Sequence, residues 1–249
     1  MESENRQNHP APFDRRALTL SAADEVDRIV SGLRRAVHQT LHRQGAVVGI
    51  SGGIDSSVVL ALCVRAFGPE RVVGLMMPER DSSPDSALLA TRLAEQFGVT
   101  AITEDISAVL EGSGCYRRRD EAIARLFPEF GPGWKAKIVI PGSLLDEDTL
   151  NVFHVTVVSP GGQTFSRRMP LREYAQVVAA SNLKQRNRMT MLYYHAELRN
   201  YAVVGTGNKN EHALGFFVKY GDGGVDVQPI LHLFKTQVFL LAEYLGVPE

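Results

Sequence analysis

The hydrophobic positions of this chain fall into short apolar runs and longer segments with helical spacing. Apolar runs of strand length occur at 47–50, 71–77, 99–106 and 201–205. Segments with helical periodicity flank them at 21–43, 58–66, 86–97, 170–180, 182–198 and 235–244. Strands that alternate with helices are typical of a parallel, doubly wound sheet with helices on both faces. The pattern therefore predicts an α/β fold whose ligands bind at the carboxyl ends of the strands.

Residues 111–169 depart from this alternation. A loop leads into a short helix there, and β-branched runs follow at 137–140 and 152–158, with a turn at Pro160-Gly161-Gly162. Such runs around a Pro-Gly turn favour an antiparallel hairpin. We interpret about 112–169 as a β-hairpin insertion outside the parallel sheet.

Several residues of this insertion carry groups that are common in active sites. We expect Trp134 to anchor the hairpin and His154 to be structural, because it lies on a β-branched strand. The basic triplet Arg117, Arg118 and Arg119 could contact phosphates, but a solvated helix start is the favoured interpretation.

Composition limits the class of protein. The chain has 249 residues, 44% of them hydrophobic and 22% charged, which fits one large domain over 21–249 after a leader at 1–20 that we expect to be disordered. The formal net charge of -1 gives no field that attracts nucleic acid or an anionic membrane. No apolar run approaches the roughly 20 residues of a membrane span, and the leader lacks the apolar core of a signal peptide.

The two cysteines point to a reducing compartment. Cys63 lies in an apolar helix and is expected in the core, whereas Cys115 is expected in a Gly/Ser loop. We predict neither a disulfide between them nor a cysteine metal site. A cytoplasmic location follows as the expectation.

The stretch VVGISGGIDSS at 47–57 carries the strongest chemical signal. A strand enters a glycine turn here, and a helix begins directly after it. Glycines allow a ligand to approach the backbone closely, and the free N–H groups of a first helical turn attract an anion. Ser51, Ser56 and Ser57 add hydroxyl donors, so the stretch predicts a phosphate-binding turn rather than an ordinary strand-to-helix connection.

The phosphate turn contains an acid and lacks the lysine of the common nucleotide-binding loop. Asp55 beside a phosphate site makes sense if it holds a metal ion between its carboxylate and phosphate oxygens. Glu211 opens a later helix, where it serves either as a helix cap or as a second carboxylate for the same ion. Two carboxylates, phosphate oxygens and water would complete the octahedral shell of Mg²⁺.

Other polar segments are expected at the same edge of the sheet. Thr206, Gly207 and Asn208 follow a strand, as does the segment after Pro78, which we expect to line an adenine pocket. KYGDGGVD at 219–226 suits a loop that wraps a polar ligand. Arg186 and Arg188 are open between an anion contact and plain surface, whereas His212, which has no partner histidine at ligand spacing, is expected to be a pocket-wall or surface residue.

The turn string resembles the signature loop of the N-type ATP pyrophosphatases. Together with NLKQRNRM, GTGNKNEHALGFFVKYGDGGVD and LFKTQVFLLAEYLGVPE, in this order, it resembles the ammonia-dependent NAD synthetase family. The resemblance covers most of the chain from about residue 21, apart from the hairpin region. It implies an adenine nucleotide α-hydrolase-like, Rossmann-like domain.

The resemblance also implies an activity: ATP-dependent amidation of deamido-NAD through an acyl-adenylate, with ammonia as nitrogen donor and with release of AMP and pyrophosphate. No protein nucleophile is implied; Asp55 and Lys235 support catalysis by position and charge. Asp55 and Glu211 would bind Mg²⁺, and the dinucleotide contacts would be Arg186, Lys219 and Asp226. ATP would contact Gly49, Ile50, Ser51, Gly52, Gly53, Ile54, Asp55, Ser56, Thr206 and Lys235.

The family resemblance further implies a homodimer, with ammonia taken from solution or from a separate glutaminase. Two departures from the family pattern are the hairpin insertion and an apparently cut-short C-terminus, which would leave the active-site set incomplete. A related pyrophosphatase ligase or amidotransferase acting on another carboxylate is therefore an alternative, as is a catalytically incomplete nucleotide-binding paralogue. A tRNA thiolation role is disfavoured because a catalytic cysteine pair and a basic domain are not evident.

Overall fold

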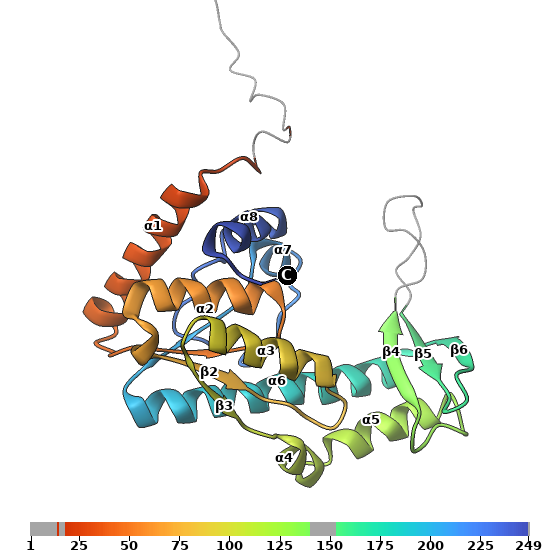
Figure 1. The fold of residues 1–249 in the computed structure, drawn as a ribbon. Helices are drawn as coiled ribbons and strands as arrows, with labels where there is room; N and C mark the ends of the chain where they lie inside the picture. Colours follow the sequence, from red (N-terminus) through yellow and green to blue (C-terminus); the bar gives the residue numbers. More distant parts are fainter. Residues whose placement is uncertain (1–13, 15–17, 140–152, 249) are drawn as a thin grey trace, which may run out of the picture.

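The computed structural model describes residues 14, 18–139 and 153–248, so the predicted leader falls largely outside it. Its centre is a parallel sheet, of which Figure 1 labels β2 and β3. The strand order is β3-β2-β1-β7. The strands are β1 (Ala46–Gly49), β2 (Val72–Met76), β3 (Thr100–Thr103) and β7 (Ala202–Val204). All pairings are parallel, and each strand follows a helical segment, which confirms the predicted doubly wound α/β fold.

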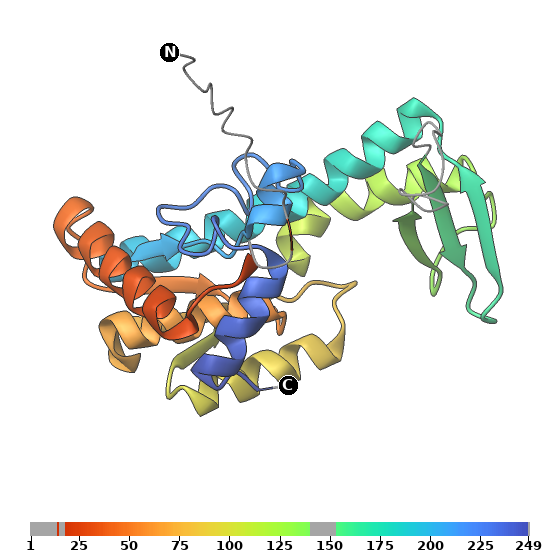
Figure 2. The same ribbon diagram turned by 90° about the horizontal axis from the view of Figure 1, so that it is seen from above.

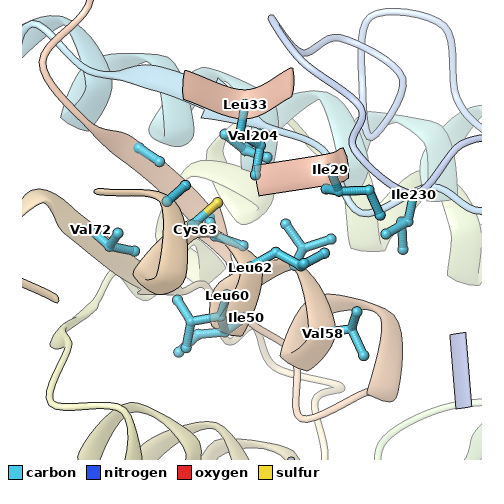
Figure 3. Close-up of a cluster of buried hydrophobic side chains, with 14 of the residues drawn as sticks. Ile29, Leu33, Ile50, Val58, Leu60, Leu62, Cys63, Val72, Val204 and Ile230 are labelled. Carbon is cyan, nitrogen blue, oxygen red and sulfur yellow. The ribbon is translucent and has the colours of Figure 1, made fainter. Parts of the chain in front are cut away.

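One face of the parallel sheet carries four helices and the main hydrophobic core. They are α1 (Ala22–Arg34), α2 (Ile54–Phe67), α3 (Pro84–Gln96) and α8 (Lys235–Leu245). Figure 3 shows side chains of α1 and α2 gathered with Ile50, Val72 and Val204 of the strands and their ends. Burial of these apolar side chains fixes the position of α2, and with it the turn that precedes α2.

The opposite face of the sheet is covered by α6 (Leu171–Arg199), whose Leu192 and Ala196 pack on Val47 and Val73. Helices α4 (Ser107–Gly112) and α5 (Cys115–Ala124) lie beside α6. The prediction of two helices at 170–180 and 182–198 was wrong. No proline or glycine interrupts residues 171–199, so one helix of 29 residues continues through the polar Ser-Asn step.

A separate antiparallel sheet lies at the far end of α5 and α6 (Figure 2). Its strands, in the order β4-β5-β6, are β4 (Lys135–Val139), β5 (His154–Val158) and β6 (Thr164–Arg168). The predicted hairpin is thus one strand short of the observed sheet. The sequence does not identify β6, because every residue of β6 is exposed and its sequence lacks an apolar alternation. Val155 and Val157 of β5 pack with Ile123 and Val177 into a second hydrophobic core.

The predicted roles of two aromatic groups in this sheet fit the structure. The Trp134 ring lies 6.1 Å from that of Phe130 and 6.2 Å from that of Phe165, so it anchors the sheet as expected. His154 lies on β5, where it pairs with Val139 of β4 and Arg168 of β6, and it lines neither of the cavities described below. The expected strand ends at 140 and 152 lie outside the described residues.

Three further predictions concern helix boundaries and cysteines. The helix predicted at 21–43 is α-helical only to Arg34 and continues as the wider π-helical segment η2 (Arg35–Thr40). Cys115 starts α5 and is buried rather than lying in a loop, because its side chain packs against Ala180. Cys63 is in the core as predicted, and both thiols are free.

The remaining helical segments are short: η3 (Pro69–Arg71) and α7 (Lys209–Ala213). Among the described residues, none of the helices has both the length and the apolar character that crossing a membrane requires.

Candidate active site

A cavity of about 480 Å³ opens where the strands of the parallel sheet end. Its walls include the ends of β1, β2 and β7, which meet at one edge because the three strands run parallel. Five of the predicted site residues line it: Gly49, Ile50, Ser51, Thr206 and Glu211. Pro78, Ser82 and Ser83 also line it, so the segment after Pro78 lies at the expected place.

The glycine turn after β1 is held by hydrogen bonds within itself. Gly52 has a φ of 78°, and a Cβ atom there would lie 2.9 Å from the carbonyl oxygen of Ser86 on α3. Only glycine satisfies both demands without strain. The Ser56 and Ser57 hydroxyls donate to the Gly53 carbonyl at 2.8 and 3.0 Å, so they stabilise the turn in this state.

Asp55, in the first turn of α2, joins three distant parts of the chain. One carboxylate oxygen accepts a hydrogen bond from Nδ2 of Asn208 at 3.2 Å, and the other pairs with the ammonium of Lys235. The Asp55 side chain is 19% exposed and that of Lys235 is 40% exposed. An acid and a base that the sequence separates by 180 positions are therefore direct neighbours.

Glu211 lies beside Asp55 through the same asparagine. Asn208 caps α7: its side chain accepts from the Glu211 N–H at 3.1 Å, while its own N–H donates to the Glu211 carboxylate at 3.0 Å. The capping role considered for Glu211 is thus real, and the residue also lines the cavity. Asn208, only 2% exposed, hydrogen-bonds to both acids, of which Glu211 lines the cavity.

This pair of acids suits a cation that is shared with a ligand. Across the part of the chain that the structure describes, His, Cys, Asp and Glu form no cluster of three or more that could hold a metal. Two carboxylates alone bind Mg²⁺ incompletely, because its six ligands are normally completed by phosphate oxygens and water. The donor set therefore fits Mg²⁺ that enters with a nucleotide.

The three predicted dinucleotide contacts lie outside the cavity wall. The Arg186 side chain is exposed and donates to the Lys219 carbonyl at 3.3 Å. Asp226 accepts from the Tyr193 hydroxyl at 2.9 Å and from the Val203 N–H at 2.8 Å. Burial and the neighbouring Asp226 carboxylate raise the pKa of Tyr193 to about 12. Asp226 thus ties its loop to α6 and β7.

Helix α6 supplies four cavity residues, of which sequence reasoning considered only Arg188 as a contact for an anion. They are Gln185, Arg188, Met189 and Leu192. Their spacing of three or four residues places them on one face of the helix. That spacing is visible in the sequence, but it would equally describe a face packed on the sheet.

The wall segment 78–83 contributes Glu79 and Asp81 to a partly buried ionic cluster centred on Glu79. Its carboxylate accepts from the Lys184 ammonium at 2.9 Å and from the Tyr116 hydroxyl at 2.8 Å. Lys184 also donates to Asp81 at 2.8 Å, and Asp81 pairs with Arg119. Burial alone would raise the pKa of Glu79, but hydrogen bonds from Lys184, the Asp81 N–H and Tyr116 outweigh it, so the pKa is lowered.

The ionic cluster answers the question left open for the basic triplet. Arg119 forms ion pairs with Asp81 and Asp120. Arg117 forms an ion pair with Glu121 on the exposed side of α5. Arg118 donates to the Ser113 carbonyl at 2.7 Å. None of the three lines the cavity.

A smaller recess of about 90 Å³ adjoins the cavity and shares with it Gly207, Glu211 and Asp222. His212 forms part of its wall and stacks on Phe217 with 5.8 Å between the ring centroids. This position agrees with the prediction that His212 is a pocket-wall residue.

Known proteins share both the sequence and the fold. The chain is 54% identical over 232 residues to the NH(3)-dependent NAD(+) synthetase of Mesorhizobium japonicum, across 93% of this chain and 72% of that protein. It is 50% identical over 237 residues to the NH(3)-dependent NAD(+) synthetase of Rhizobium meliloti, across 95% of this chain and 70% of that protein.

Among solved structures, the NMN synthetase from Francisella tularensis superposes with a TM-score of 0.62 and 25% identity, covering 92% of this chain and 73% of that one. The sequence model described as NAD synthase matches residues 25–124 and 150–249, which include the glycine turn, Asn208, Glu211 and Lys235. On these matches, the chain belongs to the NAD synthase family.

Proposed function

We propose that this chain catalyses the ATP-dependent amidation of deamido-NAD to NAD, with ammonia as the nitrogen donor. One observation carries the proposal: hydrogen bonds and an ion pair join Asp55 of the glycine turn, Asn208, Glu211 and Lys235 into one cluster, and Glu211 of this cluster lines the cavity formed by the strand ends. Relatives that are 54% and 50% identical bear the name of this activity. The reaction makes the enzyme a ligase that forms a C–N bond.

The chemistry follows from the charges at the site. A carboxylate is a poor electrophile, so its oxygen first attacks the α-phosphate of ATP, forming an acyl-adenylate and expelling pyrophosphate. Ammonia then attacks the acyl carbon, the nitrogen releases one proton to water, AMP leaves with the bonding pair, and the amide remains. Protein groups that stabilise the leaving pyrophosphate lower the barrier where charge develops.

Each site residue has a role in this proposal. Asp55 and Glu211 would hold Mg²⁺, which would supply positive charge to the departing phosphates. The Lys235 ammonium, which is paired with Asp55, would supply further positive charge to the phosphates. The first-turn N–H groups of α2 face the same anion. Catalysis rests on position and charge rather than on a protein nucleophile.

The partners follow from the same proposal. The chain would bind ATP, deamido-NAD and ammonia, would act as a homodimer in the cytoplasm, and could receive ammonia from a separate glutaminase. Arg186, Lys219 and Asp226 would contact the dinucleotide, and exposed side chains near them would lie at the dimer contact. The antiparallel sheet would be an insertion; it includes 135–139, which lie between the two ranges matched to the family.

The test is a coupled assay on the purified protein with ATP, Mg²⁺, ammonium and deamido-NAD. NAD, AMP and pyrophosphate should form in equal amounts, and Asp55→Asn should abolish all three. Arg117→Met, which removes an exposed arginine on α5, is the matched control.

Nicotinate mononucleotide should replace deamido-NAD poorly. If pyrophosphate is released only with this or another acid, the enzyme is a ligase for a different carboxylate. If ATP binds without any release of AMP, the protein is a nucleotide-binding paralogue. Either result refutes the proposed reaction.

A further inference from the structure

Arg188 is a partly buried cation in the cavity wall without a matching anion. Its Nε donates to the Met77 carbonyl at 3.5 Å and its Nη1 to Oε1 of Gln185 at 3.4 Å. Both hydrogen bonds are long, and both acceptors are uncharged. Among the described residues, Arg188 forms no ion pair, and it lines the cavity with donors that the two long hydrogen bonds do not use.

The carboxylate that attracts Arg188 through space is already occupied. Glu79 attracts Arg188 through space, but both its oxygens accept hydrogen bonds, from Lys184, from Tyr116 and from the Asp81 N–H. Burial therefore outweighs this attraction and lowers the pKa of Arg188.

Arg119, on the other side of the same ionic cluster, gives a direct comparison. Burial opposes the charge of Arg119 as well, yet hydrogen bonds to Asp120 and Asp81 more than compensate, and its pKa is raised. Two partly buried arginines thus differ in one respect: Arg119 has carboxylate partners and Arg188 has none. A cation kept from water without a partner costs free energy, which is recovered when a ligand brings the anion.

We infer that Arg188 binds the α-phosphoryl group of the nucleotide, an inference that rests on the proposed function. The pyrophosphate would leave beside Asp55 and Lys235, which do not line the cavity. Gly49, Ile50 and Arg188 do line it. The part of ATP inside the cavity is therefore the adenosine and the phosphate joined to it. Only that phosphate is an anion, and a guanidinium can bind two of its oxygens at once.

This position gives Arg188 a role in the reaction. The α-phosphorus gains a fifth oxygen neighbour when the carboxylate attacks, and the same phosphate carries the charge of the departing AMP in the second step. A guanidinium held in the cavity wall by α6 stabilises this charge at both stages.

The experiment compares the wild type with Arg188→Met, Arg188→Gln and the control Arg117→Met, using calorimetric titration with AMP, adenosine and magnesium pyrophosphate. Loss of a charge-assisted hydrogen bond pair should weaken AMP binding about tenfold to a hundredfold. Adenosine and pyrophosphate binding should change by less than about twofold, since neither carries an α-phosphoryl group in the cavity. Far-UV circular dichroism and thermal unfolding report whether each variant folds.

Several outcomes would overturn the assignment. Equal losses for AMP and adenosine would place Arg188 at the base or ribose, and a loss for pyrophosphate would place it at the leaving group. Unchanged AMP binding combined with a higher KM for deamido-NAD would assign it to the acid. If Arg188→Met does not fold, Arg188→Gln decides, because it keeps polar atoms at the position.

The two proposals fail separately. A wild type that forms NAD, together with an Arg188→Met variant that binds AMP normally, refutes the role of Arg188 alone. A wild type that binds AMP but makes no NAD refutes the proposed reaction, and the titrations still decide the role of Arg188.

Discussion

Replacement of Lys184 by methionine tests the ionic cluster that supports the cavity wall. The side chain of Glu79 is 6% exposed and that of Lys184 is 14% exposed, so the pair is largely withdrawn from water. Lys184→Met keeps the aliphatic stem but removes the ammonium that both Glu79 and Asp81 use. The variant therefore leaves one buried carboxylate with only neutral donors.

The expected cost follows from the exposure of the two acids. Breaking a buried ion pair by removing one partner costs about 3–5 kcal/mol, because the remaining charge stays buried. Asp81 is 36% exposed and retains Arg119, so we reduce the estimate to about 2–3 kcal/mol. Urea unfolding at pH 7 measures this loss directly. As a control, Glu121→Gln removes an exposed pair on α5 and should cost no more than about 0.5 kcal/mol.

The pH dependence of the free energy of unfolding provides a second test of the ionic cluster. The folded-state pKa of Glu79 is lowered from 4.5, so its stabilising effect is present above that value and disappears as the pH falls through the folded pKa. In Lys184→Met the buried carboxylate is better tolerated once it is protonated. The stability difference between wild type and variant should therefore shrink between pH 7 and about pH 3. A difference below about 0.5 kcal/mol at pH 7, or one independent of pH, would refute the ionic account.

Three further substitutions test other parts of the site. Asp55→Asn should lower kcat for AMP release by at least about a hundredfold, because it removes the carboxylate that would carry the cation; steady-state assays at saturating Mg²⁺ measure this. Tyr193→Phe should destabilise the protein by about 1–2 kcal/mol in urea unfolding, since its hydroxyl bonds to Asp226 at 2.9 Å. Gly52→Ala should cost more than about 1 kcal/mol and weaken ATP binding in titrations, because its φ of 78° and the 2.9 Å approach to Ser86 both exclude a side chain.

The fold could be predicted largely from local patterns. The β-branched runs and amphipathic segments identified each strand of the parallel sheet and most of its helices, since central strands that are buried on both faces, such as β1 and β2, consist of continuous apolar runs. The antiparallel sheet was harder to predict. Its third strand, TFSRR, is exposed at every position, so pairing with β5 rather than burial makes it a strand. Helix α6 was divided in two because a polar Ser-Asn step resembles a break although nothing there stops a helix.

In the candidate site, too, some residues could be predicted from the sequence and others could not. The glycine turn, Asp55 and Glu211 are visible in the sequence because their spacing has a chemical meaning of its own. Asn208 is recognisable as a helix cap, but its contact with Asp55 arises only when β1 and β7 become neighbours. Arg188 and Lys184 resemble any other cations of a long helix. Their roles depend on which of them meets a carboxylate, and that is decided by packing between α5, α6 and the wall segment.

The residues predicted to contact the dinucleotide do not form an enclosed site within one chain. Arg186 and Lys219 lie together on the surface outside the cavity wall, near the exposed Phe216 and Tyr220. The cavity itself has room and charge for the nucleotide end of an adenylate, with Arg188 as its available cation. A second substrate held by Arg186 and Lys219 would therefore lie across an open face. The proposed homodimer would close that face, so dimerisation and binding of the acid should be lost together.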